Sequence, residues 1–121
     1  MMKRKTLVIG ASARESQYSN IAIRQLREKG HPVVAFGRES CTIADVAVET
    51  VFPVDQDIDT VTLYLNPERQ QAFYEQIINL HPERIIFNPG TENPELAKLA
   101  AENGIATIEA CTLVMLSVGN Y

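Results

Sequence analysis

The sequence has no tryptophan, only two cysteines and two histidines, and no excess of basic residues. Its net charge of −4 argues against nucleic acid as the main partner, because phosphate binding needs a basic face. No apolar run approaches the roughly 18 residues of a membrane span. No signal-peptide pattern opens the chain either, so we expect no membrane partner. Cys41 and Cys111 are too far apart for a metal-type spacing, which favours free thiols, no metal and a cytoplasmic protein.

The 121 residues, 45% apolar and 21% charged, are typical of one globular domain that spans residues 1–121. Buried-type strands alternate with helical patterns, which predicts an α/β fold with one doubly wound, mainly parallel, five- or six-stranded sheet of the Rossmann-like kind. The predicted strands are Lys5–Ile9, Pro32–Phe36, Ala47–Val51, Thr60–Leu65, Arg84–Asn88 and Ile105–Glu109. The predicted helices are Tyr18–Lys29, one from the Asn66 cap to Leu80 and one from the Asn93 cap to Asn103, with one or two helical turns in the tail Cys111–Tyr121.

The most informative segment is the first strand and the turn after it. Thr6–Ile9 shows no polar alternation, as expected of a strand buried on both faces of a parallel sheet. Gly10 then allows a sharp turn and a close approach of a ligand, and a helix begins near Tyr18. A strand, a small-residue turn and a helix N-terminus together indicate an anion site for a nucleotide. The glycine fingerprint is incomplete, with Ser at position 12 and Glu at position 15, so an ordinary βα turn is the alternative.

The end of the second strand bears on the choice of cofactor. An NAD site places an acid there to hold the ribose hydroxyls, but this chain reads Phe36-Gly37-Arg38. A guanidinium at this place favours a phosphate on the ribose, as in NADP or coenzyme A. Arg14 could add a contact to the pyrophosphate. The alternative is that both arginines are solvated loop residues.

A second dense loop, residues 88–93, follows the fifth predicted strand. It offers the Asn88 amide, the Pro89-Gly90 turn and the start of a capped helix, and its alternative interpretation is a well-capped βα turn. Tyr64-Leu65-Asn66 lies between the two loops, where it could follow the middle of a ligand.

Enzyme signatures are missing from the sequence. There is no reductase pair of Tyr with Lys four residues later, no G-x-S-x-G elbow and no P-loop. His31 and His81 fall in helix-to-strand loops, on the edge opposite the predicted site, so neither can serve there as a general base. The Cys41 and Cys111 thiols follow strands on the ligand edge and are either small buried hydrophobes or partners for a ligand thiol.

The chain resembles the small stand-alone CoA-binding proteins, one-domain Rossmann-like relatives of the CoA-binding domain in the succinyl-CoA synthetase α subunit. The segments that carry the resemblance are Val8–Ser12, Tyr18-Ser19, Val61–Pro67, Asn88–Gly90 and Ala110–Thr112. The resemblance implies that Gly10, Ala11 and Ser12 hold the pyrophosphate and that Arg38 meets the phosphorylated ribose. It also implies that residues 64–66 and 88–90 line the path of the pantetheine arm.

Two departures from the family pattern lie in this site. Many relatives carry Asn-Pro where this chain has Gly37-Arg38, and many have Gln-Pro-Gly at residues 88–90. The synthetase's phosphohistidine belongs to a domain that is absent here, so the resemblance does not imply ligase chemistry.

The sequence therefore predicts non-catalytic binding of coenzyme A or acyl-CoA at the carboxyl ends of the parallel strands. Two alternatives are a small NADP-binding oxidoreductase and an interaction module that has kept the fold and lost the ligand, which could pair through Leu113–Leu116. A homodimer is a possible assembly. Leu113–Leu116 could equally complete the protein's own core. The candidate cofactor-binding residues are Gly10, Ala11, Ser12, Arg14, Ser19, Gly37, Arg38, Tyr64, Leu65, Asn66, Asn88, Pro89 and Gly90.

Overall fold

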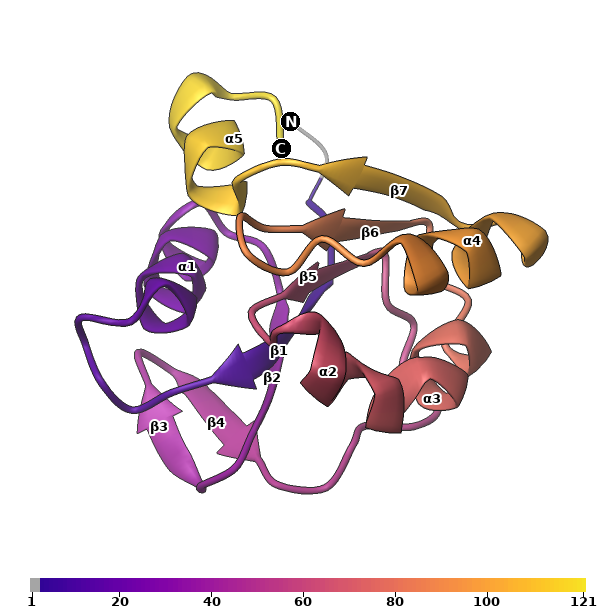
Figure 1. Ribbon diagram of the computed structural model, residues 1–121. Helices are drawn as coiled ribbons and strands as arrows, with labels where there is room; N and C mark the ends of the chain where they lie inside the picture. Colours follow the sequence, from indigo (N-terminus) through magenta and orange to yellow (C-terminus); the bar gives the residue numbers. More distant parts are fainter. Residues whose placement is uncertain (1–2) are drawn as a thin grey trace.

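The computed structural model describes residues 3–121, which form a seven-stranded sheet with helices on both faces (Figure 1). The strands are β1 (Thr6–Ala11), β2 (Val33–Gly37), β3 (Cys41–Ile43), β4 (Val46–Glu49), β5 (Thr60–Leu63), β6 (Arg84–Phe87) and β7 (Ala106–Glu109). The helices are α1 (Tyr18–Glu28), α2 (Pro67–Gln70), the 3-10 turn η1 (Gln71–Phe73), α3 (Tyr74–Asn79), α4 (Pro94–Glu102) and α5 (Thr112–Val118). The strand order is β3-β4-β2-β1-β5-β6-β7, and only the β3–β4 pair is antiparallel. The predicted Rossmann-like α/β fold is confirmed, with seven strands in place of the predicted five or six.

Two hydrophobic layers enclose the sheet, one on each face. In β1, Leu7 and Ile9 join the layer under α2, α3 and α4, while Val8 joins Ile23 of α1 and Leu116 of α5 on the other face. The three β1 side chains are fully buried. Burial of each such side chain stabilises the folded state by about 1.5–3 kcal/mol. The sheet is therefore a rigid platform on which the strand-end loops are placed.

The predicted helix from Asn66 to Leu80 is interrupted at Phe73. Its backbone, with φ of −118° and ψ of 6°, separates η1 from α3. The Phe73 ring packs against Phe36 at 5.1 Å and Phe52 at 5.8 Å between ring centroids. Aromatic pairs of this kind are worth about 0.5–1.5 kcal/mol beyond their buried area. The prediction of one continuous helix was wrong, and the break lies at the residue whose ring makes these contacts.

The structure adds to the sequence prediction at two further places, the segment after β2 and the tail. β3 was not predicted, and it forms a hairpin with β4, which is shorter than the predicted strand. The tail forms the helix α5, whose Met115 and Leu116 are buried in the core while Val114 is 56% exposed. The tail thus completes the core of the protein, one of the two interpretations open from the sequence.

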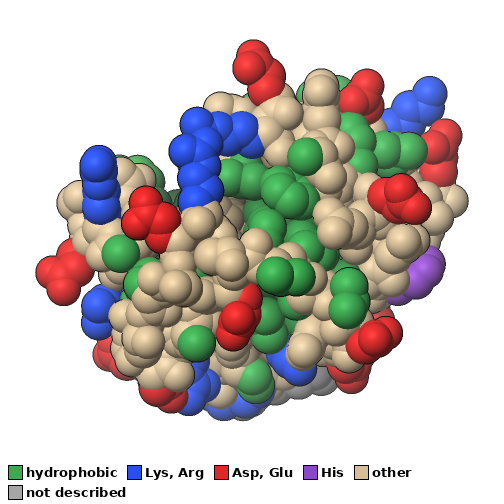
Figure 2. Space-filling model, turned by 90° about the horizontal axis from the view of Figure 1, so that it is seen from below, with side chains coloured by type: hydrophobic (Ala, Val, Ile, Leu, Met, Phe, Trp, Pro, Cys, Tyr) green, Lys and Arg blue, Asp and Glu red, His purple; other side chains and the backbone are tan. Residues whose placement is uncertain are grey.

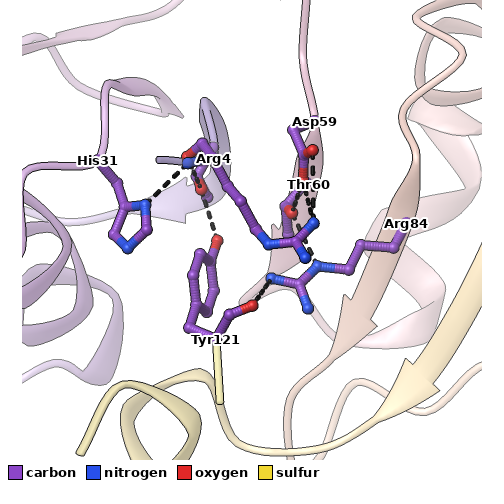
Figure 3. A network of polar contacts seen from close by, with 7 residues as sticks. Arg4, His31, Asp59, Thr60, Arg84 and Tyr121 are labelled. Atoms are coloured by element: carbon purple, nitrogen blue, oxygen red, sulfur yellow. Dashed lines mark hydrogen bonds and ion pairs between the residues drawn. The ribbon is translucent and has the colours of Figure 1, made fainter. Parts of the chain in front are cut away.

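A buried polar network closes the amino-terminal edge of the sheet (Figure 3). His31 is fully buried, and its Nδ1 accepts a hydrogen bond from the backbone N–H of Arg4 at 2.9 Å. Arg4 pairs with Asp59 at 3.2 Å, and Arg84 donates to the backbone carbonyl of Tyr121 at 2.8 Å. His31 follows α1, and His81 lies between α3 and β6, so both histidines occupy helix-to-strand connections, as predicted.

Two classes of feature are absent from the part of the chain that the structure describes. None of its helices combines the length and the apolar character that a membrane span requires. Residues 3–121 also contain no group of His, Cys, Asp and Glu side chains arranged to hold a metal ion.

Candidate functional site

A cavity of about 740 Å³ lies at the carboxyl ends of β1, β2 and β5. The strand order reverses at β1, because β2 lies on one side of it and β5 on the other. Ligands of open α/β sheets bind in the crevice at such a switch point. Figure 2 shows hydrophobic side chains in a hollow of the molecule with Lys or Arg side chains at its rim. The residues that line the cavity are Gly10, Ala11, Ser12, Ala13, Arg14, Gln17, Phe36, Gly37, Arg38, Glu39, Thr50, Tyr64, Leu65, Glu68, Arg69, Ala72 and Phe73.

Two glycines bring backbone segments together at the base of the cavity. The register of β1 against β2 shifts between Ile9 and Ala11, and Gly10 in between adopts a φ of +97°. A Cβ atom on Gly10 would lie 2.9 Å from the backbone oxygen of Tyr64. A Cβ atom on Gly37 would lie 2.4 Å from the backbone oxygen of Ala11. The sequence requires glycine at both positions because the main chain occupies the space of a side chain.

Helix α1 begins beside the cavity with unpaired backbone donors. Gln17, its N-cap residue, lines the cavity and makes no side-chain capping bond, and the first turn carries no acid. Within residues 3–121, the N–H groups of Tyr18 and Ser19 have no hydrogen-bond acceptor. The helix dipole adds a partial positive charge at this end. This end of α1 therefore offers an anion both N–H donors and a favourable potential.

The loop between β1 and α1 is held in place by a buried amide. Asn20, in the first turn of α1, is 1% exposed, and its Nδ2 donates to the backbone oxygen of Ser12 at 2.9 Å. Its Oδ1 accepts from Nε of Arg24 at 2.9 Å. The Ser12 hydroxyl accepts from the N–H of Arg14 at 3.2 Å. The loop is thus positioned by contacts behind it, which leaves its front open to the cavity.

Three arginines line the cavity without an internal partner. Among the residues that the structure describes, the side chains of Arg14, Arg38 and Arg69 make no hydrogen bond or ion pair. Glu39 and Glu68 also line the cavity, so three cations face two anions there, in a chain of net charge −4. A local excess of positive charge on an acidic protein favours an anionic ligand at this place.

One wall of the cavity is aromatic and apolar. The rings of Phe36 and Phe73 lie edge to face with centroids 5.1 Å apart, and Leu65 and Ala72 extend the same surface. Phe52 packs behind this pair, 5.1 Å from Phe36. A wall of this kind can hold the flat or apolar part of a ligand whose charged part meets the arginines.

Tyr64 lines the cavity but hides its hydroxyl. Its side chain packs against the layer of α1 and α5, and the hydroxyl has no hydrogen-bond partner among residues 3–121. Burial raises the pKa of Tyr64 well above its ordinary value of 10.0. The phenol is therefore neutral at ordinary pH.

Several predicted residues lie outside the cavity lining. Ser19 is 4% exposed, and Asn66 accepts from the N–H of Arg69 at 2.9 Å as the N-cap of α2. The N–H of Gly90 donates to Oε1 of Glu92 at 2.8 Å, so an acid of the same loop occupies that donor. The residues of the predicted set outside the lining are Ser19, Asn66, Asn88, Pro89 and Gly90. The cysteines are free thiols outside the lining as well.

Asn88 connects three elements beneath the strand ends. Its Nδ2 donates to the Thr62 hydroxyl at 2.7 Å and to the backbone oxygen of Leu63 at 2.9 Å. Its Oδ1 accepts from the N–H of Thr112 at 2.9 Å. With 3% exposure, this amide ties β5 and β6 to the start of α5. The geometry fits the capped-turn interpretation of the loop.

Sequence reasoning did not single out four residues that shape the cavity: Gln17, Asn20, Arg69 and Phe73. Arg69 follows the Asn66-Pro67-Glu68 cap, which places it in the first turn of a helix above β5. Arg69 could have been predicted from that position, because a helix that follows a parallel strand begins at the edge of the sheet where ligands bind. Nothing local distinguishes Phe73 from an ordinary core residue of a helix.

Structures of several other proteins share this architecture. A crystal structure of an uncharacterized protein matches with a TM-score of 0.96 and 41% identity over 100% of both chains. The structure of cell-free ID.343 from Thermus thermophilus matches with a TM-score of 0.85 and 20% identity over 98% of this chain and 91% of that one. The dinucleotide-forming acetyl-coenzyme A synthetase 1 of Ca. Korarchaeum cryptofilum, in complex with phosphate and ADP, matches with a TM-score of 0.70 and 15% identity. The match covers 88% of this chain but 25% of the synthetase, and at this identity it shows the fold alone.

No curated protein sequence matches the chain. Residues 4–117 match the sequence profile of the family described as CoA binding domain, which spans nearly all of the chain and every strand-end loop around the cavity. The match agrees with a sheet that carries an open, arginine-lined crevice at its switch point. The chain therefore belongs to the CoA binding domain family.

Proposed function

We propose that the protein binds coenzyme A or an acyl-CoA in the cavity above β1, as one domain and without catalysing a reaction. The observation that carries the proposal is that three arginines without a partner among residues 3–121 line one open cavity, next to the start of α1. Gln17, the N-cap residue of α1, is part of the lining, and the N–H groups that follow it have no acceptor within the same residues. Membership of the CoA binding domain family supports the identity of the ligand. CoA carries a diphosphate, a phosphorylated ribose, an adenine ring and a long amide arm, and the cavity offers a complement for each kind of group.

The diphosphate is assigned to the loop Gly10–Ser12 and the start of α1. The Gly10 turn and the absence of an acid in the first turn of α1 allow a doubly charged group to approach the backbone. Arg14 adds a guanidinium, which pairs well with phosphate oxygens.

The phosphorylated ribose is assigned to Arg38 at the end of β2. Its neighbour Gly37 has no side chain that could stand between the strand end and a ribose. The Arg38 side chain makes no ion pair with any of residues 3–121. The backbone of Tyr64 and the Leu65 side chain then line the way for the pantetheine arm. Asn88 and Asn66 contribute to this path through the loops that they fix, since their side chains are engaged internally.

A binding role without turnover fits the chemistry of the lining. It contains no His or Cys, and the Tyr64 phenol is buried and neutral. Incubation with acetyl-CoA should release no free thiol above the rate in buffer, as followed with a thiol reagent. Protein-dependent thiol release, lost in Arg38→Ala, would establish catalysis instead.

The binding test is a thermal-shift series with CoA, dephospho-CoA, NADP and NAD. A ligand at 100 times its Kd stabilises the folded state by about 2.7 kcal/mol. At about 3–5 °C per kcal/mol for a protein of this size, Tm should rise by about 8–14 °C with CoA. The rise should be smaller with NADP and dephospho-CoA and least with NAD.

The matched variants are Arg38→Ala and Lys98→Ala, which each remove one exposed cation. Lys98 lies on α4, outside the cavity lining. Arg38→Ala should reduce the response to CoA to that of dephospho-CoA, while Lys98→Ala should leave it unchanged. A larger response to NADP than to CoA would favour the oxidoreductase alternative, and no response to any of the four would end the proposal.

A further inference from the structure

β7 is an edge strand that nothing covers within residues 3–121. It pairs with β6 on one side only, and Figure 1 shows no strand or helix beyond its outer edge. All four of its residues are exposed, and Ile108 retains 42% of its accessible surface. The other edge strand, β3, has three residues, of which Ile43 is buried. β7 is thus the longer and more open edge of the sheet.

The register identifies which backbone groups of β7 are unpaired. The N–H of Ala106 donates to Glu83 and the N–H of Ala110 donates to Phe87, so residues 106, 108 and 110 turn their polar groups toward β6. Thr107 and Glu109 alternate with them, and their N–H and C=O groups point away from the sheet. These two residues present four unpaired main-chain groups along one line.

The residues of this edge lack most of the usual protection against strand pairing. Edge strands are commonly blocked by lysine, proline or a bulge, and β7 has none of these; it is short, and Glu109 is its one charged residue. Residues 110–121, which follow it, contain no charged side chain, although 21% of the whole chain is charged. The buried centres of protein–protein interfaces are likewise poor in charged residues.

We propose that a second copy of this chain pairs with β7 in antiparallel orientation, with Ile108 opposite Ile108 of the other copy. The two copies then form one continuous sheet about a two-fold axis. Thr107 of each copy exchanges both main-chain hydrogen bonds with Glu109 of the other, so the eight unpaired groups of the two edges form four hydrogen bonds. A self-complementary edge of this kind is what a two-fold interface requires.

The neighbouring registers are worse for identifiable reasons. A shift that centres Thr107 needs the N–H of Ile105, which already donates to the backbone oxygen of Ala100 at 2.9 Å. A shift that centres Glu109 places two carboxylates opposite each other and needs the Cys111 carbonyl, which accepts from the N–H of Met115. Only the register centred on Ile108 uses every free group and keeps the two Glu109 side chains apart.

The side chains fit the same register. Ile108 pairs with Ile86 in the sheet and so lies on the face covered by α5. Two Ile108 side chains would therefore meet beside the two α5 helices, on the apolar face of the joined edge. The interface consists of four hydrogen bonds and one isoleucine pair. It should therefore bury less surface than the roughly 1,200 Å² of a stable interface, and the dimer should be weak and concentration-dependent.

A disulfide test reads the register directly. Cα atoms of a non-hydrogen-bonded antiparallel pair lie about 4.5 Å apart, within the range that a disulfide spans. In a Cys41→Ser, Cys111→Ser background, Ile108→Cys should form a covalent dimer under mild oxidation. Ala106→Cys is the matched control, since it is also exposed on β7 and lies on the same face, but its two copies would be about 13 Å apart along the strands. Equal cross-linking of both variants, or of Ala106→Cys alone, would overturn this register.

Sedimentation over a range of concentrations tests the interface itself. The dimer should appear at high concentration, and Thr107→Pro should weaken it at least tenfold, because two donors are lost without loss of a hydrogen bond inside the fold. Val114→Glu changes the 56% exposed outer side of α5 and should leave the dimer intact. A protein that stays monomeric at every concentration, or a dimer broken by Val114→Glu and not by Thr107→Pro, would refute the proposal.

Discussion

Replacing Gly10 by alanine should destabilise the fold through two effects at the base of the cavity. The first is backbone strain, since Gly10 has a φ of +97° and an L side chain there costs about 1–2 kcal/mol. The second is steric, because the new Cβ would lie 2.9 Å from the Tyr64 backbone oxygen and 3.2 Å from Cδ2 of Leu65. Crowding of this kind in a packed region costs about 1–3 kcal/mol. Gly10→Ala should therefore lower the free energy of unfolding by about 2–5 kcal/mol.

Gly90→Ala is the matched control for this prediction. Gly90 has a φ of +90°, nearly that of Gly10, but a Cβ there would have no atom of residues 3–121 within 4 Å, apart from its chain neighbours. It should cost only the strain of about 1–2 kcal/mol. The assay is calorimetric melting of the wild type and both variants, in which Tm should fall by about 3–10 °C for Gly90→Ala and by about 6–25 °C for Gly10→Ala. Equal losses for the two variants would show that the contact with Tyr64 is not tight, and the reasoning would fail.

Two further predictions concern buried polar side chains. Burial, followed by the charges of Lys3 and Arg4, lowers the pKa of His31 below its ordinary value of 6.5, so the unfolded chain binds the proton first. Stability should therefore fall as the pH drops through about 6.5. In thermal melts between about pH 8 and pH 5.5, His31→Gln should make the free energy of unfolding depend less on pH. An unchanged pH dependence in the variant would contradict the role of His31. Asn88→Ala leaves the buried Thr112 N–H and the Leu63 carbonyl without a partner and should cost about 2–4 kcal/mol in urea unfolding, whereas a loss below about 1 kcal/mol would mean that water replaces the amide.

The parts of the fold that could be predicted are those whose signals are local. The apolar run Thr6–Ile9 identifies a doubly buried strand, and α1 begins at Tyr18 as expected. Asn93 caps α4 by accepting from the N–H groups of Glu95 and Leu96, as the Asn-Pro-Glu pattern indicates. In each case the residues that determine the structure are neighbours in sequence.

The parts that could not be predicted depend on distant residues or on an unusual backbone. The β3–β4 hairpin turns at Ala44, whose φ is 55°, a conformation that alanine rarely adopts and that no Asn-Gly or Asp-Gly pair announces. The break at Phe73 depends on Phe36 and Phe52, which precede it by more than one element. Local propensity cannot report either feature.

The candidate site also has a part with local sequence signals and a part that depends on distant residues. The loop from Gly10 and the arginine after β2 could be placed at one edge, because the carboxyl ends of parallel strands share an edge. The inward turn of Asn88 could not be foreseen, since the Thr62 hydroxyl and the Thr112 N–H that bind it come from other segments. A polar side chain at a strand end serves equally as a ligand contact or as a structural clamp.

The two kinds of wall around the cavity have different consequences for redesign. At Gly10 and Gly37 the opposing main chain leaves no room, so changes there alter the sheet together with the pocket. Ala13, Thr50 and Ala72 also border the pocket, but their side chains are exposed and can grow outward without displacing the core. Selection for binding of a different ligand should therefore tolerate changes at Ala13, Thr50 and Ala72 and reject changes at the two glycines. Libraries restricted to these three positions should retain most of their folded members.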